Sequence, residues 1–182
     1  MNEAAIEPPF ASWARWFVPA FVAVLLVDQI TKVWLVSYKG ILSLPTWAQN
    51  WLQESHNTGV AWGIGNSMPV LVVIMTVVLI PILCWVWWTQ FRPLGAWENL
   101  AFGAVLGGAF GNGIDRVLSQ FGQVAGVRDF IMIDLNIVGI NYIWPTFNVA
   151  DAGICCGVIL LVVLSFFKRP VPITASETKV LV

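Results

Sequence analysis

Two aspartates of this sequence, Asp129 and Asp151, stand in surroundings that normally exclude a charge. Asp151 opens an apolar run with no further charge as far as Phe167, and Asp129 is followed by Phe130 and Ile131. Two carboxyl groups held close together cannot both ionise cheaply, so such a pair retains one proton over a wide pH range. The ionised member can take a proton from a bound water molecule while the protonated member polarises a carbonyl group. The pair therefore indicates acid–base hydrolysis as the candidate chemistry.

The composition determines what kind of protein must hold these acids. Hydrophobic residues make up 58% of the 182 residues and charged residues only 10%, which is typical of an integral membrane protein. Apolar runs of about 20 residues indicate membrane-spanning helices, and four are predicted, at 17–36, 68–88, 99–114 and 149–167. The expected fold is an all-α membrane protein: a four-transmembrane-helix bundle forming a single membrane domain over 1–182. A small extracytoplasmic β or loop element is expected around 127–144.

Two of the predicted spans carry residues that indicate how they pack. The third span contains Gly103, Gly107 and Gly111 at four-residue spacing, which predicts a smooth face for a closely packed neighbouring helix. The second span ends in a cluster of tryptophans that predicts an aromatic belt at the membrane interface, and these are Trp85, Trp87 and Trp88.

Polar residues from several predicted spans and loops fall at one membrane face. In a four-span chain the first and third spans end where the second and fourth begin. The residues at that face are Asp28, Lys32, Asn57, Asn112, Asp115, Arg116, Asp129, Asn148 and Asp151. Ionisable groups at membrane depth are costly and are usually functional. The gathering therefore predicts a site at this face.

Several of these residues also have a purely structural interpretation. An aspartate near a helix N-terminus, such as Asp151, is often only a cap. Asp28 and Lys32, four residues apart, would form a favourable helical pair that neutralises charge inside the bundle. Asn112 and Arg116 share a helix face and would either bind the substrate main chain or tie the third span to the loops. A cap does not account for a second acid, so the two-acid site remains the favoured prediction.

Other chemical classes lack the residues that they need. His56 is the only histidine, which leaves a serine or cysteine triad with a single candidate base. The three cysteines lie in apolar runs without the spacing of a zinc site. A net charge of -1 and scattered basic residues argue against a nucleic-acid partner. Asp129, Asp134 and Asp151 could hold a hard cation, a weaker prediction than acid–base chemistry. Neither a metal ion nor a cofactor is expected.

Basic residues near the span ends predict the orientation of the chain. One side of the four-span arrangement holds Arg15, Arg92, Lys168 and Arg169 and is predicted to be cytoplasmic. The opposite side has as many basic residues, but each of the three nearest the predicted site has an acidic neighbour. Both termini are therefore expected in the cytoplasm, and the polar site is expected near the extracytoplasmic face.

Five short blocks carry a family resemblance. They are Asp28-Gln-Ile-Thr-Lys32, Asn57-Thr-Gly-Val-Ala61, Gly107-Gly-Ala-Phe-Gly-Asn112-Gly-Ile-Asp115-Arg116, Val127-Arg-Asp129-Phe130 and Phe147-Asn-Val-Ala-Asp151. In order and spacing they resemble the lipoprotein signal peptidases, the type II signal peptidases of bacteria. Arg128 stands before the first aspartate of the pair, where the family more usually has an apolar residue.

The resemblance implies an aspartic endopeptidase of the bacterial cytoplasmic (inner) membrane. It would cleave the signal peptide from diacylglyceryl-modified prolipoproteins immediately before the lipid-modified cysteine, as a monomer in contact with membrane lipid and without a cofactor. Asp129 and Asp151 match the catalytic pair. The residues expected to bind substrate or support the site are Asp28, Lys32, Asn57, Gly59, Gly108, Asn112, Arg116, Asn148 and Ala150.

Two functions of other classes also remain open. A small proton-coupled membrane transporter would also place acids inside a helical bundle, although its site is expected near the midplane between structural repeats. A non-catalytic lipoprotein-binding protein would tolerate the loss of either acid.

Overall fold

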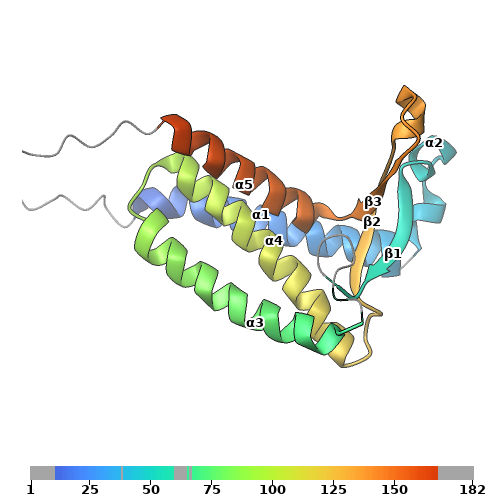
Figure 1. Cartoon of the computed structure of the whole chain (residues 1–182), viewed down its shortest axis with the longest axis horizontal. Coiled ribbons are helices and arrows are strands. Elements are labelled where there is room, and N and C mark those ends of the chain that lie inside the picture. The colour runs from blue at the N-terminus through green and yellow to red at the C-terminus, as the bar shows by residue number, and fades with distance from the viewer. Residues whose placement is uncertain (1–10, 38, 60–64, 66, 168–182) are drawn as a thin grey trace, which may run out of the picture.

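In a computed structural model the protein is a bundle of long helices with a small β-sheet at one end (Figure 1). The structure describes residues 11–37, 39–59, 65 and 67–167. The beginning of α1 (Ala11–Thr31) and the end of α5 (Val149–Phe167) both lie at the end of the bundle away from the sheet. The sheet therefore covers one end of the bundle only.

Within the described residues, three helices are long and apolar enough to cross a membrane. The first is α1 with its π-helical continuation η1 (Lys32–Ser37), the second is α3 (Pro69–Val86) with η4 (Trp87–Phe91), and the third is α5. They correspond to the predicted spans 17–36, 68–88 and 149–167 and differ from them only at the ends. The chain is therefore a multi-pass membrane protein.

The fourth long helix, α4 (Ala96–Gln120), contains the predicted span 99–114 but does not reach the apolarity of the other three. Its 25 residues give a length of about 37 Å, enough for the roughly 30 Å of a bilayer's hydrocarbon layer. It packs against α1, α3 and α5 (Figure 1), and 12 of its 25 residues are buried. Its polar side chains, including Asn112 and Asp115, therefore face protein, where membrane helices tolerate them.

Glycines of α4 allow α1 to approach closely. A Cβ atom added at Gly103 or Gly107 would lie 2.5 or 2.7 Å from a backbone carbonyl oxygen of α1. One added at Gly111 would lie 2.5 Å from the carboxylate of Asp28, also on α1. The predicted smooth face is therefore confirmed, and it leaves no room for a side chain between the two helices.

Aromatic residues close the end of the bundle away from the sheet. Trp87 stacks on Phe17 with 3.9 Å between ring centroids, and its indole N–H donates to Asn99 Oδ1 at 3.1 Å. The guanidinium of Arg92 lies 4.1 Å from the centroid of the Trp88 ring. Trp87 is only 8% exposed. The prediction that it belongs to an interfacial belt was therefore wrong, because its N–H has a buried partner on α4 that the sequence pattern did not reveal.

The sheet is antiparallel with the order β1-β2-β3. The strands are β1 (Leu52–Asn57), β2 (Val127–Asp134) and β3 (Ile143–Phe147), and the short helices beside them are η2 (Gly40–Ser43), α2 (Thr46–Gln49) and η5 (Leu135–Val138). The register pairs Ser55 with Asp129. Only Asn148 separates the end of β3 from the start of α5. The predicted β element is confirmed, and it brings Asp129 to the N-terminal end of α5.

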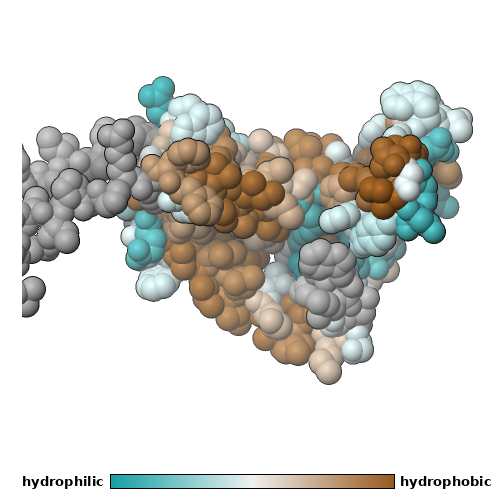
Figure 2. All heavy atoms as spheres, turned by 45° about the horizontal axis from the view of Figure 1, so that its top comes forward, coloured by the Kyte–Doolittle hydropathy of each residue, from teal (hydrophilic) through white to brown (hydrophobic). Residues whose placement is uncertain are grey.

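The surface agrees with a membrane position for the helices. Figure 2 shows predominantly apolar residues over the helical part of the molecule, with hydrophilic residues gathered toward the sheet and at the opposite end. An apolar band between two more polar ends is the pattern that a bilayer requires.

Candidate active site

Asp151 and Asn148 hold each other at the start of α5. The backbone N–H of Asp151 donates to Asn148 Oδ1 at 2.9 Å, and the backbone N–H of Asn148 donates to Asp151 Oδ2 at 3.1 Å. This reciprocal pair is a capping box, with aspartate in the place usually taken by glutamate. The cap interpretation of Asp151 is therefore correct for one of its oxygens. The other oxygen, Oδ1, accepts a hydrogen bond from Asn112 Nδ2 at 2.8 Å.

Two asparagine side chains connect the two acids. Asn148 Nδ2 donates to Asp129 Oδ1 at 2.6 Å and to Asn112 Oδ1 at 3.0 Å. Asn112 in turn donates to Asp151. Asp129 on β2 and Asp151 on α5 are therefore joined through α4 and through the residue that links sheet to bundle. The sequence separations are large, and it is the packing of α4 between these elements that closes the network.

Lys32 and Asp28 lie behind this network. Lys32 Nζ lies 2.8 Å from Asp28 Oδ2, donates to Asn112 Oδ1 at 2.9 Å and lies 3.4 Å from Asp115 Oδ2. Because the ammonium holds the oxygen of the Asn112 amide, the NH₂ group of that amide is turned toward Asp151. The side chains of Asp28 and Lys32 are both 0% exposed. They orient the site from inside the bundle.

Close packing of α4 on α5 supports the same region. Gly108 packs directly against the backbone of Ala150, which is itself fully buried. The backbone N–H of Ala150 donates to Asp28 Oδ1 at 2.9 Å. Gly108 and Ala150 thus support the site by letting α4 and α5 pack closely and, at Ala150, through a backbone hydrogen bond. A larger residue at either position would separate α4 from α5 near Asp151.

Asp115 was predicted to lie at this face, but its buried ion pair with Arg128 was not predicted. Both are buried, and Arg128 Nη2 lies 2.7 Å from Asp115 Oδ1. The sequence suggests two other pairs, because Asp115 is adjacent to Arg116 and Arg128 is adjacent to Asp129. The only signal of the true pair was the presence of Arg128 where the family more usually has an apolar residue.

Asn57, Gly59 and Arg116 line the other side of the site. Asn57 Oδ1 accepts the backbone N–H of Gly59 at 2.9 Å, and the Asn57 side chain also hydrogen-bonds to Asp129. Arg116 Nη2 donates to the Gly59 carbonyl at 3.0 Å. Within the described part of the chain, the buried Nε atom of Arg116 has no hydrogen-bond partner. Val60 and Ala61, which complete the block begun by Asn57, lie outside the described residues.

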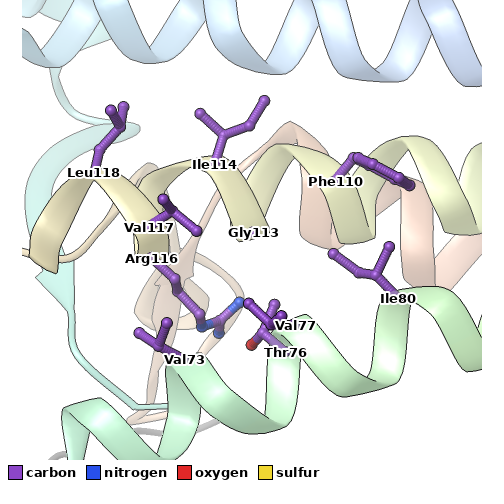
Figure 3. A pocket seen from close by; sticks show the side chains of 10 residues that line it. All are labelled: Val73, Thr76, Val77, Ile80, Phe110, Gly113, Ile114, Arg116, Val117 and Leu118. Carbon is purple, nitrogen blue, oxygen red and sulfur yellow. The ribbon is translucent and has the colours of Figure 1, made fainter.

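A groove between α3 and α4 begins at Arg116. Its volume is about 300 Å³. Figure 3 shows Arg116 extending from α4 toward Val73 and Thr76 on α3. Apart from Arg116 and Thr76 the lining residues are apolar; the lining consists of Val73, Thr76, Val77, Ile80, Phe110, Gly113, Ile114, Arg116, Val117 and Leu118. The same guanidinium therefore contacts the site loop and the apolar groove.

The environment of Asp129 suits a carboxyl group that shares a proton. Its side chain lies on β2 at the end of the bundle, and the residue is 2% exposed. Burial, together with the negative charge of Asp151, raises the pKa of the Asp129 carboxyl from 3.8 to about 7. Hydrogen bonds from Asn148 and Asn57 and the charge of Lys32 act in the opposite direction and offset only part of the rise. Asp129 is therefore poised to exchange a proton near neutral pH.

The alternative of a cation held by three aspartates finds no support in the arrangement. No group of three His, Cys, Asp or Glu side chains lies together in metal-binding positions among the residues that the structure describes. Asp134 accepts the backbone N–H of Asn136 at 2.9 Å, at the opposite end of β2 from Asp129. It therefore does not join the other two acids.

Known proteins match the chain over most of its length. The family described as signal peptidase (SPase) II matches residues 20–167. The lipoprotein signal peptidase of Bacillus subtilis (strain 168) is 40% identical over 147 residues, which cover 77% of this chain and 87% of the relative. That of Nostoc punctiforme is 35% identical over 168 residues, covering 85% of this chain and 91% of the relative.

Solved structures agree with the sequence relatives. A bacterial membrane enzyme determined by the in meso method at 2.3 Å resolution superposes with a TM-score of 0.61 at 26% identity, covering 85% of this chain and 93% of the other. A second such structure, at 1.9 Å resolution, gives a TM-score of 0.60 at 28% identity, covering 84% and 93%. These matches, together with two acids joined at one end of a membrane bundle, show that the chain belongs to the signal peptidase (SPase) II family of peptidases.

Proposed function

We propose that this peptidase cleaves the signal peptide from diacylglyceryl-modified prolipoproteins immediately before the lipid-modified cysteine, with Asp129 and Asp151 as its catalytic pair. The observation that carries the proposal is the network in which Asn112 and Asn148 join the two carboxyl groups. Cleavage of prolipoprotein signal peptides is the activity of the family, and it disfavours the transporter and the non-catalytic binding protein.

Each acid has surroundings that suit one half of the reaction. Asp151 accepts N–H donors at both oxygens, as an ionised carboxylate can, and it takes a proton from the attacking water. Asp129, with a pKa of about 7, holds the shared proton and donates it toward the carbonyl oxygen of the scissile bond. The proton on Asp151 then passes to the leaving nitrogen as the C–N bond breaks, and a hydroxyl proton of the tetrahedral intermediate returns to Asp129 as the carbonyl group re-forms. No covalent intermediate forms on the chain.

The residues around Arg116 position the substrate in this proposal. The unpartnered Nε atom of Arg116 is available to donate to a main-chain carbonyl of the precursor. The groove that starts at this residue offers an apolar space of about 300 Å³ to the hydrophobic part of the same substrate. Asn112, by contrast, is buried with its amide engaged on both sides, so its role is to hold Asp151.

We place the single membrane domain 1–182 in the bacterial inner membrane as a monomer with four spans, α4 included. Both termini are then cytoplasmic, and the sheet with its site is extracytoplasmic. Reporters fused after Gln90 and after Arg169 should read cytoplasmic, and one inserted near Asn50 should read external. The charge distribution around Arg15 and Arg92 is the physical reason. A cytoplasmic signal near Asn50 would place the site on the wrong side for an exported precursor.

Cleavage should decline as the pH rises through about 7, because the pair then loses the proton that Asp129 holds. The measurement is kcat between pH 5 and 9 on a modified precursor. Stability provides a second test with a definite sign. A pKa raised on folding stabilises the protein below pH 3.8, and this contribution is lost as the pH rises toward 7. Asp129→Asn should therefore be more stable than the parent at pH 8, with the difference vanishing near pH 4. A kcat that stays constant to pH 9 would contradict the assignment of the proton.

The decisive experiment compares two precursors that differ only in the diacylglyceryl group. The purified chain in detergent or bilayers should cleave the modified precursor before its cysteine and leave the unmodified one intact. Equal cleavage of both would refute the substrate assignment, and cleavage of neither would favour a non-catalytic function. Mass spectrometry of the products locates the bond that is broken.

A further inference from the structure

Arg128 binds one carboxylate through three N–H groups. Its Nη2 donates to Asp115 Oδ1 at 2.7 Å, its Nε to Oδ2 at 3.3 Å, and its own backbone N–H to Oδ2 at 2.9 Å. The residue is 4% exposed, and Asp115 is 0% exposed. A planar guanidinium bound at both oxygens fixes direction as well as distance. Arg128 thus locks the beginning of β2 onto α4.

The same residue also reaches the first span and the joint between sheet and bundle. Arg128 Nη1 donates to Ser37 Oγ at 3.1 Å, and Nη2 lies 3.4 Å from Gln29 Oε1. Its carbonyl oxygen accepts from Asn148 Nδ2 at 3.4 Å, and that amide also holds Asp129. One side chain and its backbone therefore tie β2 to α4, to α1 with η1, and to Asn148, the residue before α5.

Charge balance gives this arginine a second effect. The buried ionic cluster behind the site consists of Asp28, Lys32, Asp115 and Arg128, and its formal charges sum to zero. Without Arg128 the cluster would carry one uncompensated negative charge in the bundle, which is strongly unfavourable. Loss of the arginine would therefore change both geometry and charge, and the two effects can be separated by experiment.

We propose that Arg128 is a positioning residue for the catalytic carboxyl group of Asp129, which it holds in register with Asn148 by clamping β2 to Asp115. The proposal rests on the proposed function. Asp129 follows Arg128 directly in β2, so a shift of that strand along α4 moves the acid away from Asn148 and from the network that Asn148 forms with Asn112 and Asp151. Small misplacements of catalytic groups cost up to about 100-fold in rate. Arg128 itself is buried behind the site and does not contact the substrate.

The test uses Arg128→Met, which retains a long, unbranched side chain and removes the guanidinium group with its N–H donors. The number of binding-competent sites is titrated with a modified precursor whose scissile bond cannot be cleaved, and kcat is expressed per titrated site. Turnover per site should fall about 10- to 100-fold, while the Kd for the non-cleavable precursor stays within about twofold of the parent. A merely structural role would reduce the number of sites and leave turnover per site unchanged. Arg92→Met, which removes a guanidinium at the other end of the bundle, is the matched control and should retain parental turnover per site.

A second variant separates position from charge. Arg128→Met combined with Asp115→Asn restores neutrality to the cluster, because Asp28 and Lys32 then balance each other. Its thermal stability should recover relative to Arg128→Met alone, while turnover per site stays low because the clamp is still absent. Recovery of turnover together with stability overturns the proposal, as does parental turnover in Arg128→Met. Should the single variant fail to fold, the double variant decides. If Asp129→Asn keeps its activity, it is the catalytic assignment of the proposed function that fails instead.

Discussion

Asp129→Asn and Asp151→Asn should each lower the cleavage rate of a diacylglyceryl-modified precursor by about 10³-fold or more, and the double variant should be no slower than either single one. The two acids share one proton and one water molecule in the proposed reaction, so the loss of either acid removes the acid–base catalysis that depends on both. Independent contributions would multiply instead. The measurement is single-turnover cleavage by each of the three variants at equal concentrations of folded protein.

A matched control for these variants is Asp134→Asn. Asp134 lies on the same strand as Asp129 but hydrogen-bonds locally to Asn136, so the substitution should leave turnover unchanged. Asp115 is unsuitable because it binds Lys32 and Arg128 inside the bundle. Near-parental cleavage by either dyad variant, or a rate loss in the double variant equal to the product of the single losses, would reject the shared-proton mechanism.

Lys32→Met should destabilise the protein by about 3–5 kcal/mol, because two buried carboxylates, Asp28 and Asp115, would then share one buried cation. That cation is Arg128, which pairs with Asp115. The substitution should also remove activity, since Nζ of Lys32 is the charged donor, beside the Asn148 amide, that turns the Asn112 amide toward Asp151. Thermal unfolding in detergent measures the first effect, and cleavage by the remaining folded protein measures the second.

Adding Asp28→Asn to Lys32→Met tests this explanation. The double variant is neutral again, with Asp115 paired to Arg128, and the asparagine oxygen can still accept the backbone N–H of Ala150. Stability should therefore return in large part. Activity should not return, because Asn112 Oδ1 then keeps only the N–H of Asn148 and lacks the charged donor that fixes its amide. If the double variant regains parental turnover, the orienting role of Lys32 is wrong.

Much of the site could be predicted because its residues violate the rule that membrane segments exclude charge. Asp129 and Asp151 stood out in apolar surroundings, and the structure joins them through Asn112 and Asn148. Three of the four predicted spans were found as apolar helices for the same reason, since hydropathy is a local property. The fourth, α4, carries so many polar residues that its hydropathy is ambiguous, and only its packing explains them.

The partners of the buried charges could not be predicted, because adjacency in sequence says nothing about direction. Successive residues of a helix point about 100° apart, so Asp115 and Arg116 leave α4 on different sides. Asp115 meets Lys32 and Arg128, and Arg116 meets Gly59 and the groove along α3. Trp87 illustrates the same limit: an interfacial residue by pattern, it is buried because Asn99 happens to lie opposite. Such pairings depend on how each helix is rotated about its axis, and this rotation cannot be predicted from a single sequence.

The different sequence separations within the buried ionic cluster imply an order of assembly. Asp28 and Lys32 lie one helical turn apart, so α1 can enter the membrane already neutralised. Asp115 on α4 acquires Arg128 only after the chain has turned back and β2 has docked. The contact that completes charge compensation is thus also one that brings Asp129 to its place beside Asn148. A newly inserted chain whose sheet has not yet docked lacks the assembled pair of acids that we propose to be catalytic, and its proteolytic activity would begin only when its folding is complete.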